Sequence, residues 1–200
     1  MTPSPHAAVL LAAGGSARLG RPKQLLRRDG EFLVHRAARL ALATAPAELL
    51  VVVGAQEAAV RDALASLPHR AISNPHWRDG LAASLRTVAD HACAHEAVLI
   101  LACDLPALDA AHLHRLVAGA RSAPSRCAAL RWGNAPGMPA VVPGAWFADL
   151  AMAPSDAGFR QRLRALPAGS VSLLDAPEAA FDVDTPADLD VAIAQGLLDP

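Results

Sequence analysis

The sequence lacks tyrosine, has three cysteines, and has a single lysine, Lys23, among its 18 lysine and arginine residues. The odd number of cysteines and the absence of a C-x-x-C pair argue against a disulfide framework and favour reduced thiols. The apolar run near the N-terminus is too short for a membrane span, and MTPSPHAAVLLAAGG has no basic start typical of a signal peptide. We therefore expect a cytoplasmic protein that does not bind a membrane.

The chain also lacks a large excess of charge of either sign. Its formal net charge is −1 over 200 residues, which removes any bulk electrostatic case for binding nucleic acid. Any affinity for phosphate must then come from local geometry. The hydrophobic share of 53% with 18% charged residues is typical of a globular chain, and the length suits one domain, which we expect to span residues 1–200.

Apolar, strand-like segments alternate with segments of helical periodicity. The expected strands are 7–13, 48–54, 69–73, 97–104 and 127–132, and the expected helices are 32–44, 55–67, 79–92 and 109–121. This alternation is typical of βαβ units, so we predict an α/β fold with a mostly parallel sheet and helices on both faces. Ligands of such sheets bind at the carboxyl ends of the strands.

Beyond residue 132 the periodicity weakens, and proline and glycine become frequent. We expect two short helical pieces there, a candidate strand at 170–174 and a closing helix at 185–198 with Pro186 in its first turn. Asp109 is the expected N-cap of the helix that it precedes. No linker and no internal repeat divides the chain.

A loop of small residues, which we call the glycine loop (residues 12–18), follows the first expected strand in LAAGGSARLGRPKQLL (11–26). It is not a P-loop, because Arg21-Pro22 follows Gly20, and it does not fit G-x-G-x-x-G. Arg18 and Lys23 supply positive charge for a phosphate. The alternative is a tight turn in which the glycines only permit the backbone path. Backbone N–H groups that suit polyphosphate oxygens belong to Ala12, Ala13, Gly14, Gly15 and Ser16.

Three aspartates are candidate metal ligands. Asp104 ends the apolar stretch LILACD (99–104), where a carboxylate is costly to bury unless it meets a cation, and it is placed to hold magnesium. Its alternative role is to cap a turn or the next helix. Asp182 and Asp184 lie on the same side of an extended stretch before a helix, where one of them would approach a metal shared with Asp104. From spacing alone, N-capping is the favoured interpretation of this pair.

The segment NPHWRDGLAASLR (74–86) combines polar residues with the start of a helix. Asn74, Gly80 and Ser84 are candidates for reading a base or a ribose. Spacing alone favours a simpler interpretation, in which Asn74 makes an Asx turn and Trp77 packs against a loop. Cys103 is expected in the core rather than as a nucleophile.

Taken together, these motifs resemble the MobA-like nucleotidyltransferases across almost the whole chain. The segment 11–26 is similar to the signature L-A-A-G-x-S-x-R-[ML]-G-x-x-K, and its continuation Arg21-Pro22-Lys23-Gln24 is similar to the molybdenum cofactor cytidylyltransferase branch. The other segments that resemble this branch, in the same order, are NPHWRDGLAASLR (74–86), DLP (104–106), SDAGFR (155–160) and DVDTPADL (182–189).

The resemblance implies a single Rossmann-like nucleotidyltransferase domain that transfers CMP from CTP to molybdopterin and releases pyrophosphate. Arg18, Lys23 and residues 12–16 would then hold the phosphates, and Asp104, with Asp184, would hold Mg²⁺; Lys23, Arg18 and Asp104 are the implied catalytic residues. The implied contacts to base and sugar are Asn74, Gly80 and Ser84. The implied contacts to the acceptor are Gly137, Pro139, Asp156, Arg160 and Asp182.

The sequence departs from the family pattern mainly in its second half. Ala102-Cys103-Asp104-Leu105-Pro106 stands where the family has Gly-Asp-Gln-Pro, and NAPGMP (134–139) stands where it has Arg-Gly-Asn-Pro. The alternatives are a related nucleotidyltransferase that uses GTP or another phosphorylated acceptor, and a module that binds the cofactor and delivers it to a molybdenum hydroxylase. A transient contact with such a hydroxylase or its chaperone is the protein partner that the resemblance implies.

Overall fold

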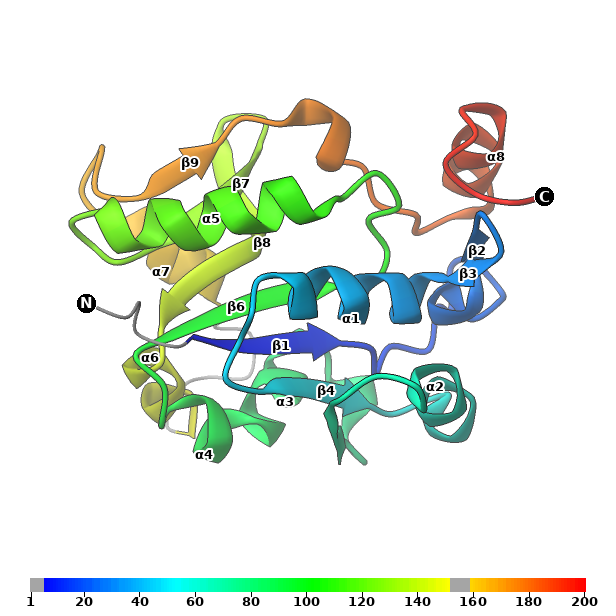
Figure 1. The fold of residues 1–200 in the computed structure, drawn as a ribbon, viewed down its shortest axis with the longest axis horizontal. Helices are drawn as coiled ribbons and strands as arrows, with labels where there is room; N and C mark the ends of the chain where they lie inside the picture. The colour runs from blue at the N-terminus through cyan, green and yellow to red at the C-terminus, as the bar shows by residue number, and fades with distance from the viewer. Residues whose placement is uncertain (1–5, 152–158) are drawn as a thin grey trace.

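The computed structural model describes residues 6–151 and 159–200. They form a single α/β domain around a seven-stranded sheet with the strand order β5-β4-β1-β6-β8-β7-β9 (Figure 1). The strands are β1 (Ala7–Leu11), β4 (Leu49–Val53), β5 (Arg70–Ser73), β6 (Ala97–Ala102), β7 (Ala128–Trp132), β8 (Ala135–Pro143) and β9 (Ser172–Leu174). The predicted mostly parallel sheet is confirmed: β8 is antiparallel to β6 and β7, whereas the other four strand pairs are parallel.

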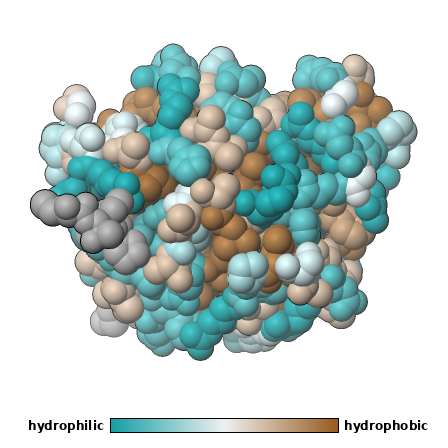
Figure 2. Space-filling view, in the orientation of Figure 1, coloured by the Kyte–Doolittle hydropathy of each residue, from teal (hydrophilic) through white to brown (hydrophobic). Residues whose placement is uncertain are grey.

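Helices cover both faces of the sheet, as predicted. One face carries α1 (Leu33–Ala43), α2 (Glu57–Leu64) and α5 (Ala110–Ser122), and the other carries α3 (Leu81–Thr87), α4 (Ala89–Ala92), α6 (Ala145–Ala148) and α7 (Phe159–Ala165). Every residue of β1 and β4 is buried, because the two helical layers cover opposite faces of these nearly continuous apolar strands. On the face of the molecule seen in Figure 2, brown hydrophobic residues lie in patches among teal hydrophilic ones.

A third cluster of apolar side chains packs α8 (Pro186–Ala194) against the segment that follows the glycine loop. This segment contains the 3-10 turn η1 (Lys23–Leu25) and a short hairpin of β2 (Arg27–Arg28) and β3 (Glu31–Phe32). The end of the chain holds the hairpin turn: the Asp199 carboxylate accepts hydrogen bonds from the N–H groups of Asp29 and Gly30, at 2.9 and 2.8 Å. The other 3-10 turns are η2 (Trp77–Asp79), η3 (Asp149–Ala151) and η4 (Pro177–Ala179).

Two sequence predictions about the elements are corrected. The helix expected at 79–92 is not continuous, because Gly80 has a φ of 91° and Val88 departs from helical geometry between α3 and α4. The irregular segment after residue 132 contains β8, the longest strand among the described residues. The prolines and the glycine of β8 prevented its prediction from sequence, because proline lacks the N–H group that a regular strand ladder uses.

The expected helix starts at Asp109 and Pro186 are confirmed. The Asp109 side chain accepts a hydrogen bond from the N–H of His112 at the start of α5, and Pro186 is the first residue of α8. Within residues 6–151 and 159–200, the helices are too short or too polar to cross a bilayer.

Candidate active site

The glycine loop leaves the carboxyl end of β1 and turns its backbone toward solvent. Ala12 and Ala13 are buried, whereas Gly14 and Gly15 are exposed. The N–H of Ala12 donates to the carbonyl of Val52 at 2.9 Å, so the prediction that it is free for a phosphate is wrong. Among the described residues, the N–H groups at positions 13–16 have no acceptor. Four successive donors of the predicted five therefore remain for a ligand.

Gln24 fixes the direction of these donors, and sequence reasoning gave it no role. Its side chain is 1% exposed, and its Nε2 donates to the carbonyl oxygens of Ala12 and Gly14 at 2.9 and 2.6 Å. In a planar trans peptide the N–H points opposite to the carbonyl. The N–H groups of Ala13 and Gly15 are therefore turned away from Gln24. The sequence shows only a glutamine directly before an apolar Leu-Leu pair, which does not by itself indicate this role.

Trp77 forms a wall beside the glycine loop. A Cβ on Gly15 would lie 2.6 Å from the Trp77 ring, so only glycine fits at this close approach. The interpretation that Trp77 packs against a loop is thus confirmed. Arg78 stacks over the same ring, with its Cζ 4.3 Å from the ring centroid.

Asn74 and Ser84 are buried beneath this wall. The Asn74 Oδ1 accepts a hydrogen bond from the N–H of His76 at 2.9 Å, and its Nδ2 donates to the Ser84 Oγ at 3.1 Å. The predicted Asx turn is confirmed, and both side chains are 6% exposed or less. Gly80 lies exposed between η2 and α3, where its positive φ favours glycine. Direct contact of these three residues with a nucleotide stays a prediction.

The three candidate aspartates converge at the carboxyl edge of the sheet. Asp104, Asp182 and Asp184, which we call the carboxylate cluster, each offer a ligand oxygen within 4.8 Å of the others. Val183, fully buried between the last two, donates its N–H to the Asp104 carbonyl at 3.1 Å. Alternation along this extended segment therefore turns Asp182 and Asp184 to the same side, as predicted.

Capping, the interpretation that spacing favoured for Asp182 and Asp184, is wrong. Thr185 is the N-cap of α8, and Asp188 completes a capping box by accepting a hydrogen bond from the Thr185 N–H at 2.8 Å. Since Thr185 satisfies the start of the helix, the two aspartates before it are left to the cluster.

Lys23 and Arg18 meet the carboxylate cluster directly. The Lys23 ammonium bonds to Asp104 and lies 2.8 Å from Asp184, and the Arg18 guanidinium lies 2.5 Å from Asp184. Burial disfavours the charge on Lys23, but Asp104 and Asp184 outweigh it and raise the Lys23 pKa. Burial acts against ionisation of Asp184 as well, yet Lys23 and Arg18 lower its pKa. The chain's single lysine is thus a fixed positive charge between two carboxylates.

Asp182 has no such cation within hydrogen-bonding distance among the described residues. Burial, and then the charges of Asp104 and Asp184, raise its pKa. Three carboxylates with oxygen ligands only are the donor set that a hard divalent cation prefers, so these residues fit such an ion.

Cys103, beside Asp104, is a core residue as predicted. It is 4% exposed, and burial followed by the Asp104 charge raises its pKa to about 12. A thiol with this pKa is protonated at neutral pH and is a poor nucleophile.

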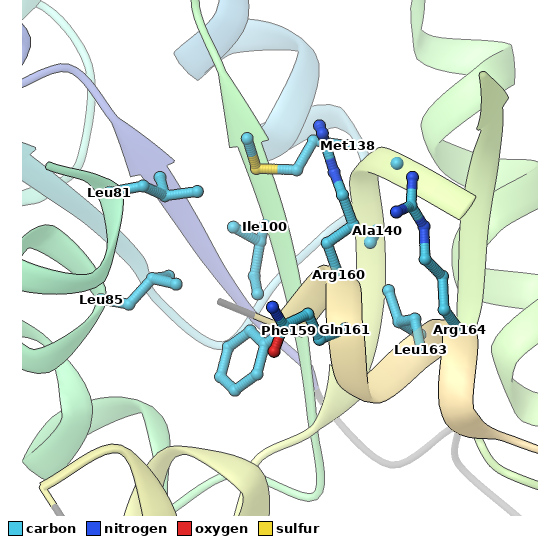
Figure 3. A pocket seen from close by; sticks show the side chains of 11 residues that line it. Leu81, Leu85, Ile100, Met138, Ala140, Phe159, Arg160, Gln161, Leu163 and Arg164 are labelled. Atoms are coloured by element: carbon cyan, nitrogen blue, oxygen red, sulfur yellow. The ribbon is translucent and has the colours of Figure 1, made fainter. Parts of the chain in front are cut away.

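The residues implied for the acceptor lie on the second half of the sheet. Gly137 and Arg160 line a cavity of about 380 Å³ between α3 and α7, which we call the α3–α7 cavity (Figure 3). Pro139 is on β8 but not among the lining residues, and Asp156 lies outside the described residues. Asp182 lies in the carboxylate cluster, and its contact with an acceptor stays a prediction.

Comparison with known proteins agrees with this architecture. The fold is similar to that of a nucleotidyl transferase from Methanothermobacter thermautotroptrophicus, with a TM-score of 0.78 and 23% identity over 96% of this chain and 97% of that chain. It is also similar to a Mycobacterium tuberculosis protein solved as a complex with manganese, with a TM-score of 0.74 and 22% identity over 96% of this chain and 99% of that chain.

The class of protein follows from the sequence match to a family model. Residues 8–171 match the MobA-like NTP transferase domain, so the chain belongs to that family and is an enzyme of nucleotidyl transfer. A curated relative, nicotine blue oxidoreductase from Paenarthrobacter nicotinovorans, is 35% identical over 188 residues, which cover 88% of this chain and 91% of that protein.

Proposed function

We propose that the protein is a molybdenum cofactor cytidylyltransferase, which transfers CMP from CTP to the terminal phosphate of molybdopterin. The observation that carries this proposal is the glycine loop with four free N–H groups, beside Lys23, Arg18 and three convergent carboxylates. Membership of the MobA-like family supports the reaction type. The resemblance of residues 11–26 and 74–86 to the cytidylyl branch favours CTP over GTP.

In this reaction an oxygen of the acceptor phosphate attacks the α-phosphorus of CTP, and the bond to pyrophosphate breaks. Catalysis of this kind depends on positioning and on stabilising charge. We assign the N–H groups of residues 13–16, with Arg18 and Lys23, to the β- and γ-phosphates and to the departing pyrophosphate. Asn74 and Ser84 shape the turn at the base and ribose, and exposed Gly80 permits close approach of the nucleotide.

Asp104 and Asp184, with Asp182 beside them, are the residues that would hold Mg²⁺. Bound there, the ion would neutralise charge on the triphosphate. Lys23 has a double task in the proposal: its ammonium balances Asp104 and Asp184 in the free protein and contacts phosphate oxygens when the nucleotide is bound.

The acceptor half rests on fewer observations. Gly137 and Arg160 line the α3–α7 cavity, which supports their role in acceptor binding; Pro139 and Asp156 keep that role by resemblance. We also propose that the product passes in the cytoplasm to a molybdenum hydroxylase or its chaperone. The free thiols of Cys93, Cys103 and Cys127 agree with a reducing compartment.

Pyrophosphate release tests the proposal. Purified protein with Mg²⁺ and molybdopterin should release pyrophosphate with CTP and much less with GTP. Asp104→Asn should lose at least a hundredfold in turnover with an unchanged circular dichroism spectrum, while the exposed control Asp90→Asn should keep full turnover. If molybdopterin gives pyrophosphate with GTP but not with CTP, the protein is a guanylyltransferase. If it binds molybdopterin tightly but releases pyrophosphate from neither nucleotide, it is a module that binds and delivers the cofactor.

The 35% sequence identity to nicotine blue oxidoreductase favours a second candidate, an oxidoreductase reaction on nicotine blue. In that case the glycine loop would hold the pyrophosphate of a dinucleotide that donates hydride. The test is oxidation of NADH or NADPH in the presence of nicotine blue. Dye-dependent oxidation without pyrophosphate release from CTP would replace the first proposal with this one.

A further inference from the structure

The segment between β6 and α5, which we call the aspartate loop (residues 104–108), is held by two arginines from another part of the chain. The Arg28 Nη1 donates to the Pro106 carbonyl, and the Arg36 Nη2 donates to the Leu108 carbonyl at 2.8 Å. Arg28 is in β2 and Arg36 is in α1. In Figure 1 the β2–β3 hairpin, the start of α1 and the green loop between β6 and α5 lie toward the same end of the molecule.

The two carbonyls belong to a tight turn that directly follows Asp104. The Leu108 N–H donates to the Leu105 carbonyl at 3.2 Å, so residues 105–108 form a β-turn with Pro106 at a position that proline favours. The side chains of Leu105 and Leu108 are 7% and 1% exposed, and their packing fixes the apolar side of the turn. The two guanidinium groups fix its carbonyl groups.

The parts of the chain that carry the arginines are themselves fixed. The Arg27 carbonyl, next to Arg28, accepts a hydrogen bond from the Asp199 N–H at 2.8 Å, and the Arg27 guanidinium lies over the Phe32 ring with its Cζ 3.8 Å from the centroid. Arg36 is part of α1, whose apolar face is buried against the sheet. Both guanidinium groups therefore extend from rigid elements.

This arrangement costs stability. Burial, followed by the charges of Arg28 and Arg39, lowers the pKa of Arg36, and the Arg36 Nε is buried without a partner among the described residues. The Arg28 Nε lies 3.6 Å from the carboxylate of Asp29, which is 89% exposed and therefore compensates little of the charge. Water alone satisfies a carbonyl at a surface turn, so two cations on one turn indicate that its position matters.

We propose that Arg28 and Arg36 are positioning residues: they fix the aspartate loop so that the Asp104 carboxylate stays at the distance from Asp182 and Asp184 that a divalent cation requires. Within the described part of the chain their bonds to the loop go to backbone carbonyls and not to the carboxylate cluster. The inference rests on the metal role of Asp104 in the proposed function.

The sign of the effect on metal binding distinguishes positioning from simple electrostatics. Removal of a positive charge near three carboxylates, by itself, makes the cluster attract a cation more strongly. Removal of a group that positions a ligand weakens binding instead, commonly by ten- to a hundredfold for partners of metal ligands. Arg28→Gln and Arg36→Gln should therefore each weaken metal binding, although each makes the protein more negative.

A Mn²⁺ titration followed by electron paramagnetic resonance measures this binding without any substrate. Both Gln variants should bind Mn²⁺ about tenfold more weakly than the wild type, and Arg28→Lys, which keeps a cationic donor, should lose less. Arg115→Gln, an exposed change on α5 with the same change in charge, should bind like the wild type. Unchanged or tighter binding by both Gln variants, or no Mn²⁺ binding by the wild type, would overturn the inference.

Amide hydrogen exchange tests whether the effect passes through the aspartate loop. In Arg28→Gln and Arg36→Gln, peptides that cover residues 103–110 should exchange faster than in the wild type. Peptides from α7 should exchange at the wild-type rate, and the circular dichroism spectrum should be unchanged. Weaker Mn²⁺ binding with wild-type exchange in the loop, or faster exchange throughout the chain, would contradict a positioning role.

The inference and the proposed function fail in different ways. If molybdopterin and CTP release pyrophosphate but Arg28→Gln needs no more Mg²⁺ than the wild type for half-maximal release, the positioning role is wrong and the function stands. If Mn²⁺ binding and loop exchange change as described but molybdopterin gives no pyrophosphate with any nucleotide, the positioning role stands and the function is wrong.

Discussion

At the scale of single residues, Gln24 shows how one buried amide sets the direction of backbone groups. Its two donor hydrogens hold the carbonyls of Ala12 and Gly14, and its Oε1 lies 3.5 Å from the Ser16 hydroxyl. Ser16 in turn accepts a hydrogen bond from the N–H of Lys23 at 3.1 Å. The side chains of Gln24 and Ser16 thus connect the backbone of the glycine loop to the backbone of Lys23 by hydrogen bonds.

Gln24→Leu removes both donors while keeping an apolar volume of similar size. We expect the KM for CTP to rise about tenfold or more, because the loop N–H groups lose their fixed direction, with the KM for the acceptor unchanged. Loss of two buried hydrogen bonds should cost about 1–3 kcal/mol of unfolding free energy. Exposed Gln195→Leu is the control, and an equal rise in both KM values would contradict a role confined to the triphosphate.

Lys23→Ala tests which phosphates of the nucleotide the Lys23 ammonium contacts. Because we assign Lys23 to the β- and γ-phosphates, its loss should weaken CTP binding about tenfold to a hundredfold, the usual cost of a hydrogen bond to a charged group. CMP has neither phosphate, so its binding should change little. Titration calorimetry of both nucleotides measures the difference, and equal losses would place the ammonium elsewhere.

At the scale of elements, sequence pattern predicted those segments whose own residues determine their structure. β1, β4 and β6 are nearly continuous apolar runs, and the parallel order followed from their alternation with helices. β8 could not be predicted, because Pro136, Gly137 and Pro139 oppose a strand locally and only pairing with β6 and β7 holds it there.

The site residues likewise differ in whether local sequence or distant contacts determine their position. Lys23, Arg18 and Asp104 were found from a loop and a strand end, that is, from local sequence. The approach of Asp182 and Asp184 to Asp104 depends on where α8 begins, and spacing alone could not distinguish a cap from a ligand. Gln24 was missed because its partners, two backbone carbonyls, leave no trace in a side-chain pattern.

Thr185→Ala tests how the start of α8 supports the site. Removal of this N-cap should cost about 1 kcal/mol of unfolding free energy, measured by urea denaturation. Since Asp184 directly precedes the cap, the KM for CTP should also rise severalfold. The control is Ser122→Ala at the exposed end of α5, which should leave the KM unchanged; a Thr185→Ala protein that loses stability but keeps its KM would separate the cap from the site.

At the scale of the whole molecule, buried His6 makes stability depend on pH. Burial, followed by the nearby charge of Arg121, lowers its pKa from 6.5 to about 4. Its Nε2 lies 2.8 Å from the Thr44 Oγ1, and its Nδ1 has no partner among the described residues. Unfolded chains therefore bind a proton between about pH 6.5 and 4 that the folded protein does not bind, so stability falls as the pH falls through this window.

The expected loss from His6 between pH 7.5 and 5 is about 2 kcal/mol of unfolding free energy. Urea denaturation at both pH values should show this loss in the wild type and a smaller one in His6→Gln, which retains a side chain able to bond to Thr44. His76→Gln, an exposed change, should behave like the wild type. The same pH dependence in His6→Gln would assign the effect to other groups.

Segments far apart in the sequence meet at the site, and this has a consequence for the order of synthesis. Arg18 and Lys23 find Asp184 more than 160 positions later, and the hairpin at Asp29 and Gly30 waits for Asp199. Because a chain emerges from the ribosome N-terminus first, Lys23 is made before both of its carboxylate partners, with Asp104 following it and Asp184 coming later still. A nascent chain therefore lacks one of the two carboxylates that hold Lys23 until Asp184 has been translated, more than 160 residues after the lysine.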